Sequence, residues 1–348
     1  MSEIKATPQA SGVAQNEMRH IPVMLDEVIK YLAPKPSEVF VDGTFGAGGY
    51  STAILNLGAN VIAIDRDPDA IADGADLVAR FDGRLKLLPG KFSQMDVLVA
   101  EAGADLVDGV VLDVGVSSMQ INEDERGFSF LHDGPLDMRM AQTGPSAADL
   151  VNNLERANLT RIIGILGEER HASRVSKAII ERREVEPFSR TLDLAKVVEK
   201  AVGKTKNDRI HPATRTFQGL RIFVNSELEE LALALLAAER ILKPGGRLVV
   251  VSFHSLEDRL VKRFLVDRSS EYVGSRHLPQ ADSRPITFSL LKRGAVAPKA
   301  HEVECNPRAR SAKLRAGLRT DAPAGKPDLS IFKLADFSGV VEIPRRDA

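Results

Sequence analysis

A run of glycines follows directly after a short hydrophobic stretch and an acid. Residues 39–41 favour a strand, Asp42 ends it, and four glycines precede a helical stretch that begins near Ser51. Such a junction of strand, glycine turn and helix N-terminus leaves backbone N–H groups unpaired and lets a ligand approach the main chain closely. The segment therefore predicts a binding site for a small molecule.

Two acids indicate which molecule fits this turn. Asp65 follows the second predicted strand, and its carboxylate suits the two hydroxyls of a ribose, as in NAD or S-adenosylmethionine. The nearest G-x-G-x-x-G register begins at Gly46 and has Ser51 in place of the third glycine. Asp42 would repel a pyrophosphate but attract the cationic methionine end of S-adenosylmethionine. We therefore favour S-adenosylmethionine, while an acid that only caps the turn is the alternative for Asp42.

A polar loop, DVGVSS, follows the fourth predicted strand and begins at Asp113. An exocyclic amine such as cytosine N4 is a poor nucleophile because its lone pair is delocalised, so catalysis needs acceptors for the amine hydrogens and a place for the proton. Carbonyl groups near Val116 and the hydroxyls of Ser117 or Ser118 are candidates, although either serine could equally cap the next turn. His254 is a candidate general base, with a structural histidine as the alternative.

Aromatic and basic residues occur together in two further stretches, 126–140 and 211–231. Phe128, Arg139 and Arg215 in these stretches are candidates to stack on and neutralise an unpaired base of a nucleic acid. Core packing is the alternative for the aromatic residues. The sequence thus indicates a nucleic-acid substrate without deciding which residues contact it.

Charge is unevenly distributed along the chain. The net charge is −1, but residues 259–319 contain fourteen Lys or Arg and five Asp or Glu, a local balance of +9 that leaves −10 for the rest. Such asymmetry is typical of a protein with a polyanionic partner, and equally of a solvated basic face.

Alternating strand and helix patterns must position these residues. Asp42, Asp65 and Asp113 each end a predicted strand, which is the arrangement of ligand contacts in a parallel, doubly wound sheet. The predicted strands cover residues 39–41, 61–64, 85–88, 109–112 and 248–252.

The chain between the fourth and fifth predicted strands is far longer than one crossover connection needs. Helical periodicity covers residues 146–166, 173–183 and 191–202, and a longer helix is predicted at 226–242. We predict an all-helical subdomain inserted into a discontinuous sheet domain, and a closing hairpin that includes residues 306–315. The predicted parts are a tail (1–19), the sheet domain (20–134 and 213–325), the helical insert (135–212) and a C-terminal tail (326–348).

Composition limits location and chemistry. The 348 residues are 43% hydrophobic and 27% charged, an ordinary soluble composition. Neither a membrane-length apolar stretch nor the apolar block of a signal peptide occurs, so we expect a cytoplasmic protein without a membrane partner. Cys305 is the single cysteine, which excludes a disulfide framework and a thiolate zinc site within one chain, and we predict no metal.

Nine motifs between His20 and Arg319 resemble, in order, those of the bacterial 16S ribosomal RNA cytosine-N4 methyltransferases, the RsmH or MraW family. Among them are HIPVMLDEV, VDGTFGAGGYS, AIDRDPDAI, LDVGVSS, HPATRTFQGLRIFVNSELEEL and NPRARSAKLR. The resemblance implies a class I S-adenosylmethionine-dependent, Rossmann-like methyltransferase with an inserted helical RNA-recognition subdomain. It also implies a decoding-centre cytosine of 16S ribosomal RNA, in the small ribosomal subunit, as methyl acceptor. The oligomeric state stays open, with a homodimer among the alternatives.

The resemblance also implies a set of cofactor contacts. Many relatives have His and Pro where this chain has Tyr50 and Met119, so a side-chain contact from Tyr50 is not carried over. Asp42 is not among the family's contacts. The implied contacts are Gly48, Gly49, Tyr50, Asp65, Phe92, Asp113 and Gln120.

Other reaction classes stay as alternatives. An amino-directed methyltransferase of DNA would be expected to show Pro-Pro-Tyr or Pro-Pro-Phe after the fourth-strand acid, where this chain has Val-Gly-Val-Ser. A methyltransferase of another RNA, a dehydrogenase and a non-catalytic RNA-binding module are the remaining possibilities.

Overall fold

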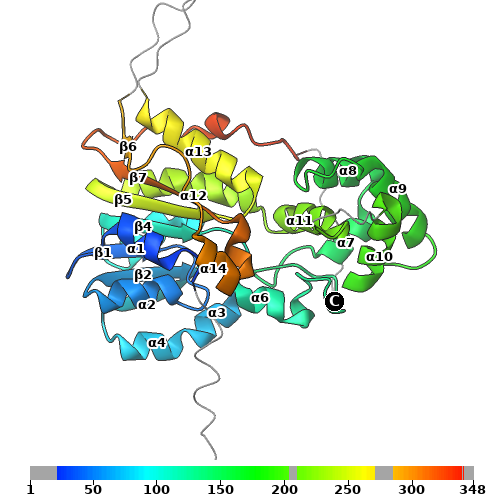
Figure 1. Ribbon diagram of the computed structural model, residues 1–348, viewed down its shortest axis with the longest axis horizontal. Helices are drawn as coiled ribbons and strands as arrows, with labels where there is room; N and C mark the ends of the chain where they lie inside the picture. Colours follow the sequence, from blue (N-terminus) through cyan, green and yellow to red (C-terminus); the bar gives the residue numbers. More distant parts are fainter. Residues whose placement is uncertain (1–21, 204–209, 271–284, 339, 341–348) are drawn as a thin grey trace, which may run out of the picture.

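A seven-stranded, mostly parallel sheet forms the larger part of the molecule (Figure 1). The computed structural model describes residues 22–203, 210–270, 285–338 and 340. The strand order is β3-β2-β1-β4-β5-β7-β6, and β7 alone among these strands runs opposite to the others. The strands are β1 (Val39–Asp42), β2 (Asn60–Asp65), β3 (Leu85–Pro89), β4 (Val107–Asp113), β5 (Leu242–Ser252), β6 (Phe288–Leu290) and β7 (Lys313–Arg319).

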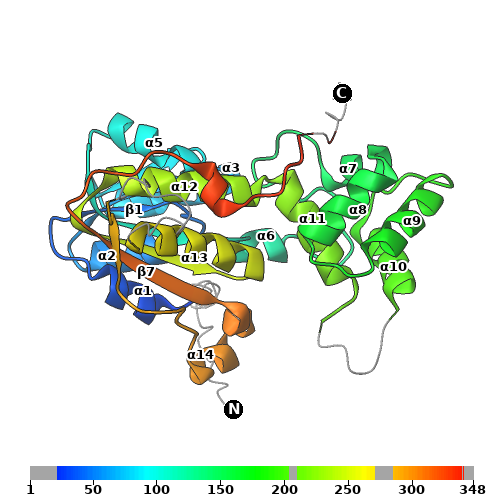
Figure 2. The same ribbon diagram turned by 90° about the horizontal axis from the view of Figure 1, so that it is seen from above.

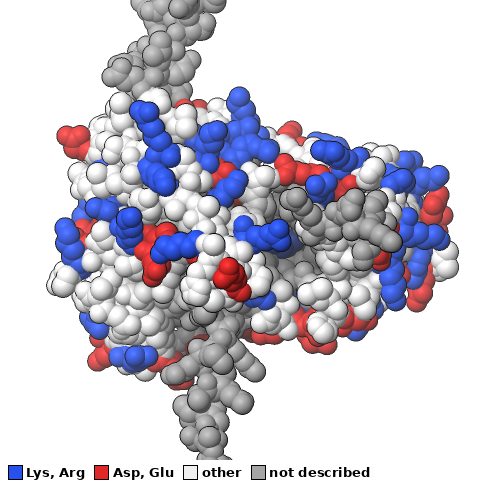
Figure 3. All heavy atoms as spheres, viewed as in Figure 1, with Lys and Arg blue, Asp and Glu red and all other residues white. Residues whose placement is uncertain are grey.

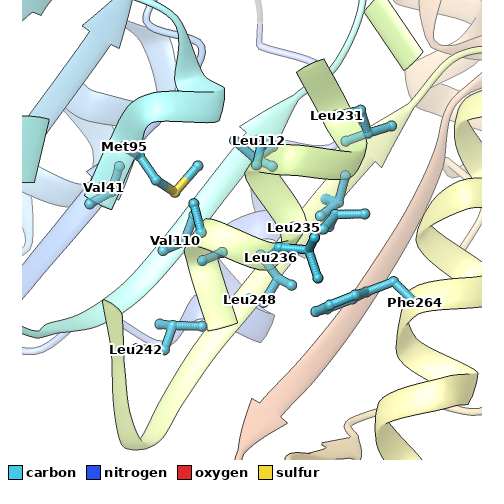
Figure 4. Close-up of a cluster of buried hydrophobic side chains, with 14 of the residues drawn as sticks. Val41, Met95, Val110, Leu112, Leu231, Leu235, Leu236, Leu242, Leu248 and Phe264 are labelled. Atoms are coloured by element: carbon cyan, nitrogen blue, oxygen red, sulfur yellow. The ribbon is translucent and has the colours of Figure 1, made fainter. Parts of the chain in front are cut away.

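Helices cover both faces of this sheet because residues of its central strands are apolar on both sides. On β4, Val110 and Leu112 point into one core with α5, α12 and α13, whereas Val111 points into the other with α1 and α2. Figure 4 shows the first core, where Met95 and Phe264 pack around β4 and β5. The helices are α1 (Leu25–Leu32), α2 (Gly49–Asn56), α3 (Pro68–Asp73), α4 (Ala75–Arg80), α5 (Met95–Glu101), α6 (Ser118–Asn122), α12 (Glu227–Ile241), α13 (Ser255–Ser269) and α14 (Ala300–Cys305).

A separate helical lobe has its own hydrophobic core (Figure 1). The helix predicted at 146–166 is two helices, because Leu154 and Glu155 adopt extended backbone angles between them. Phe217 and Leu220 belong to this core, so it extends past the predicted boundary at residue 212. The lobe's helices are α7 (Ala147–Asn153), α8 (Arg156–Ile165), α9 (Ala172–Arg183), α10 (Thr191–Val202) and α11 (Ala213–Val224).

Part of the segment that the sequence analysis assigned to a C-terminal tail packs against both lobes. Phe332 is fully buried in the sheet core and lies parallel to Phe264, with 6.3 Å between ring centroids. Phe337 meets Phe223 of the helical lobe edge-to-face at 5.6 Å, and Arg161 donates a hydrogen bond to the Asp336 carbonyl. Residues 329–338 therefore connect the two lobes, passing α12 and α13 on the way (Figure 2). The predicted N-terminal tail, 1–19, lies outside the described residues.

Basic side chains gather over α13 on the face seen in Figure 3. Part of this charge is neutralised locally: Asp258 accepts from Arg315 at 2.7 Å and from Lys313 at 3.4 Å, and Glu168 accepts from Arg259 at 3.0 Å. The local excess of positive charge is thus smaller than the residue count indicates. In the part of the chain that the structure describes, no helix is long and apolar enough to cross a membrane.

Candidate active site

A cavity of about 660 Å³ lies at the carboxyl ends of the strands and extends to the helical lobe. Asp65, Asp113 and the glycine turn line its sheet side, as the strand pattern predicts. Phe92, which opens a 3₁₀ turn after β3, also lies on this side. Phe130 and Phe217 line the opposite side. The cavity therefore joins the predicted cofactor residues to aromatic residues of the second lobe.

The glycine turn leaves open space in front of Gly46. A Cβ added there would meet nothing closer than Ser117 Cβ at 3.9 Å, and φ is +51°. Gly48 serves the turn instead, because its N–H donates to the Phe45 carbonyl at 2.7 Å and an added Cβ would clash with Leu77. Gly49 lines the cavity. Of these glycines, Gly46 is the one whose lack of a side chain opens the wall to a ligand.

Tyr50 lines the cavity, but its hydroxyl is already used. It donates to the Val23 carbonyl, and burial raises the pKa of this phenol well above its usual value. Its ring can therefore contact a ligand, while its hydroxyl holds the N-terminal segment against α2.

Asp65 is held in place by two backbone groups. Its Oδ2 accepts from Gly46 N at 2.8 Å and its Oδ1 from Asp67 N at 2.9 Å. Burial raises the pKa of the carboxyl, while these hydrogen bonds oppose the rise. Each oxygen keeps a second lone pair, so the group can still accept from ribose hydroxyls.

The structure corrects the role of Asp42. Its Oδ2 accepts from the Ser51 hydroxyl at 2.7 Å and its Oδ1 from Thr44 N at 3.1 Å, and it does not line the cavity. Burial raises its pKa to about 6. Asp42 therefore shapes the turn, and its charge is not the feature that selects the ligand.

Asp113 lines the cavity, and one of its carboxyl oxygens has no compensating partner among the described residues. Its Oδ1 is buried and has no hydrogen-bond partner among the described residues. Burial, followed by the charges of Asp42 and Glu257, raises its pKa to about 8. An unpaired carboxyl on a cavity wall suits a cationic ligand group, which would restore its ionised form.

The loop after β4 is fixed by a capping box. Ser117 Oγ accepts from Gln120 N, and Gln120 Oε1 accepts from Ser117 N, both at 3.1 Å. The amide of Gln120 also donates to Asp67 Oδ2 at 2.7 Å. Ser117 thus caps α6, which the sequence analysis gave as the alternative to contact with the substrate. Gln120 supports the cavity wall through hydrogen bonds to other residues of the protein. The Ser118 side chain lies outside the described part of the structure.

His254 lies in a buried group of charges beside the cavity. Its Nε2 is 2.9 Å from Glu257 Oε1, and both ring nitrogens are buried. Both oxygens of Glu227 accept from Arg221 at 2.9 Å. The ligand atoms of Glu227, His254 and Glu257 lie within 4.8 Å of one another, a spacing that suits a metal. Since Arg221 already occupies Glu227, we interpret this group as an ion-pair network, which favours the structural role of His254.

The helical end of the cavity is aromatic. Phe130 has its ring centroid 4.8 Å from both Phe217 and His211. Phe128 also lines the cavity, as expected. Arg139 and Arg215, predicted to lie near the base, do not line it, and Arg139 pairs with Asp137 at 2.5 Å. Short sequence stretches could not show which face of each arginine's segment turns inward.

Two cavity residues, Gln218 and Arg221, were missed by the sequence analysis. Their spacing from Thr214 and Phe217 places all four on one face of α11, which is a signal the sequence contains. That signal could not be distinguished from an ordinary buried helix face without knowing what lies opposite.

Comparisons with known proteins agree with this geometry. The family model of the MraW methylase family matches residues 17–319. The chain belongs to the MraW methylase family. It is 59% identical over 339 residues to a protein of Brucella canis and to one of Brucella suis biovar 1, both named ribosomal RNA small subunit methyltransferase H. These matches cover 97% of this chain and 97% of each relative.

Likeness to solved structures is more distant. TrmN from Thermus thermophilus is 11% identical, with a TM-score of 0.38 over 85% of this chain and 48% of that one. A likeness of this size supports no conclusion about function.

Membership of the MraW methylase family makes the protein a methyltransferase. Its mostly parallel sheet with a reversed β7 is the class I methyltransferase fold, and S-adenosylmethionine is the methyl donor. The cavity fits this donor, because Asp65 can hold a ribose, Gly46 leaves room beside the main chain and Asp113 is an unpaired acid for a cationic end.

Proposed function

We propose that the protein methylates the exocyclic N4 of a decoding-centre cytosine in the 16S ribosomal RNA of the small ribosomal subunit. The names of the Brucella relatives support ribosomal RNA of the small subunit as the substrate class. The motifs shared with the cytosine-N4 methyltransferases support the amine as acceptor. The observation that supports the proposal best is that one continuous cavity runs from Asp113 to the aromatic residues of the helical lobe.

The reaction requires an unpaired base. A stacked, paired amine cannot direct its lone pair to a methyl donor, so the cytosine must leave its stack at a cost of about a few kcal/mol. Phe130 and the residues packed around it offer an aromatic surface that would offset this cost by stacking.

The protein's part in the chemistry is to orient the amine and to accept its proton. When bound, S-adenosylmethionine supplies an electrophilic methyl group. Gly115 and Val116 line the cavity near Asp113, and their carbonyl groups would accept an amine hydrogen, which directs the nitrogen lone pair away from them. Asp113, whose pKa lies near 8, and His254 are the candidate proton acceptors, while the hydroxyls of Ser117 and Ser118 are candidates to hold the amine hydrogens.

An amino-directed methyltransferase of another RNA or of DNA is the alternative function. It would use the same cofactor side of the cavity, so residues on that side do not distinguish the two. The substrate itself does.

The test offers the purified protein three substrates with labelled S-adenosylmethionine: small ribosomal subunits lacking the modification, naked 16S ribosomal RNA and DNA. Nuclease digestion and mass spectrometry should yield N4-methylcytidine from one site in the ribosomal RNA. Asp65→Asn is the matched low-activity control, because the amide keeps the size of the side chain. Methyl found on cytosine C5 or on a ribose 2′-oxygen would contradict the proposal.

A further inference from the structure

One face of α11 forms the wall of the cavity at the helical lobe. Thr214, Phe217, Gln218 and Arg221 all line the cavity, and their separations of three and four residues place them in one stripe along the helix. The stripe therefore presents an aromatic ring, an amide and a guanidinium to the same space.

The orientation of the Gln218 amide follows from its partner. Its Nε2 donates to the Leu166 carbonyl at 3.0 Å, and a carbonyl can only accept, so the amide cannot be turned the other way. This leaves Oε1 as the free end, without a hydrogen-bond partner among the described residues. Gln218 is only partly buried, so Oε1 can serve as an acceptor for a group in the cavity.

Arg221 is also held on one side and free on the other. Its Nε and Nη2 donate to the two oxygens of buried Glu227, each at 2.9 Å, which fixes the plane of the guanidinium. Within the described residues Nη1 has no hydrogen-bond partner, and it is not among the polar atoms sealed from solvent. Arg221 therefore offers a fixed donor one helical turn from the acceptor of Gln218.

This pair matches one pyrimidine. The amine at N4 carries the N–H donors of the cytosine ring, while N3 and O2 are acceptors. Uracil has the opposite pattern at two of these positions, with an acceptor at O4 and a donor at N3, and adenine has no oxygen at the place of O2. A donor beside an acceptor on a fixed helix face thus discriminates among bases by hydrogen bonding.

We propose that α11 reads the Watson–Crick edge of the target cytosine. Gln218 Oε1 accepts one hydrogen of the N4 amine, and Arg221 Nη1 donates to the N3 and O2 edge. The second amine hydrogen is left for the carbonyl groups of the loop after β4, so the two lobes hold the amine from both sides. This inference rests on the proposed function and adds the residues that select the base.

The test uses small subunits that carry either cytidine or the 4-deamino analogue pyrimidin-2-one riboside at the mapped target position. The wild-type protein should bind the cytidine form about 5- to 150-fold more tightly, the range of the two hydrogen bonds that the amine makes. Gln218→Leu should lower this preference about threefold to tenfold, the share of one hydrogen bond, and should keep its affinity for S-adenosylmethionine. Gln142→Leu, outside the cavity, is the matched control and should retain the wild-type preference.

A second analogue tests Arg221 in the wild-type protein, so the main measurement does not depend on a variant that could unfold. Subunits carrying 3-deazacytidine lack the N3 acceptor, and the wild-type protein should bind them about threefold to tenfold more weakly than cytidine. A variant adds to this test. Provided that its Tm equals that of the wild type, Arg221→Lys should lose the preference for cytidine over 3-deazacytidine, whereas Arg215→Lys on the same helix should keep it.

The outcomes separate this inference from the proposed function. If wild-type product analysis finds no N4-methylcytidine, the proposed function is wrong and the inference is wrong with it. If N4-methylcytidine forms but Gln218→Leu keeps the full preference for cytidine, or the wild-type protein has no preference, α11 does not read the base.

Discussion

The two ends of the cavity differ in how far their polar groups are already satisfied. At the sheet end, Asp65 accepts two backbone N–H groups and Gln120 is engaged on both sides of its amide. At the helical end, Gln218 and Arg221 each use part of their polar group in a hydrogen bond to the protein, while Gln218 Oε1 and Arg221 Nη1 have no partner among the described residues. The sheet end is thus pre-organised for a ligand that is the same in every turnover, while the helical end keeps hydrogen bonds for a base that must be selected.

The two ends are held in register by contacts between the lobes. The side-chain amide of Asn225 donates to the Met138 carbonyl at 2.7 Å and accepts from Met140 N at 2.9 Å. The backbone carbonyl of Asn225 accepts from Arg66, the residue after Asp65. Residues 329–338 add a second connection on another side of the molecule. Changes at one end should therefore leave the other end intact only where these contacts are kept.

The largest effect is expected from Asp65→Ala at the sheet end. Loss of charge-assisted hydrogen bonds to a ribose costs about 1.5–3 kcal/mol, or roughly 10- to 150-fold in affinity for S-adenosylmethionine. Calorimetry on the folded variant measures this. Asp73→Ala, an exposed acid of the neighbouring helix, is the control and should bind normally. Unchanged binding by Asp65→Ala would mean that the ribose is held elsewhere.

Phe130→Ala tests the other end. Removal of a stacking surface should lower kcat/KM for the RNA substrate about tenfold, since base stacking on an aromatic ring contributes about 1–3 kcal/mol. Affinity for S-adenosylmethionine should not change. Tyr31→Ala, an aromatic residue outside the cavity, controls for the general loss of a ring. A loss of cofactor binding in Phe130→Ala would show that the two ends are not separable.

Asp113→Asn tests a sheet-end carboxyl that has an unpaired oxygen among the described residues. The pKa of this carboxyl is raised from 3.8 to about 8 in the folded protein, so the ligand-free fold binds the proton more tightly than the unfolded chain and loses stability as pH rises from about 4 through 8. An amide has no such dependence. The Tm of Asp113→Asn relative to wild type should therefore increase between pH 6 and pH 9, by about 5–10 °C for roughly 3 kcal/mol. A difference that stays constant over this range would contradict the raised pKa.

The smallest effect is expected from Phe337→Ala in the connecting segment. Its edge-to-face contact with Phe223 contributes about 0.5–1.5 kcal/mol, so Tm should fall by about 2–4 °C. Methyl transfer should fall a few-fold, with cofactor affinity unchanged, because the lobes lose part of their alignment. Leu329→Ala, at a more exposed position of the same segment, should change neither quantity measurably. An unchanged rate in Phe337→Ala would indicate that the other contacts align the lobes on their own.

The sequence by itself determined part of the sheet end of the site. Strand patterns ending at Asp65 and Asp113 predicted acids along one edge of the sheet, because the carboxyl ends of parallel strands meet there; the two strands flank β1. The glycine turn is a local feature of a few residues, so it too was readable. The long gap between the fourth and fifth strands predicted a helical insert, since no single crossover needs so much chain.

Only the tertiary structure decided which side chains face the cavity and which are used elsewhere. Asp42 binds Ser51 and does not line the cavity, and Ser117 caps a helix, although their sequence context fits contact with a ligand equally well. The inward face of α11 became visible only when residues about one hundred positions away supplied the opposite wall. Phe332 and Phe337 lie in a stretch whose composition reads as a tail, because their burial depends on Phe264 and Phe223, partners that local sequence patterns do not identify.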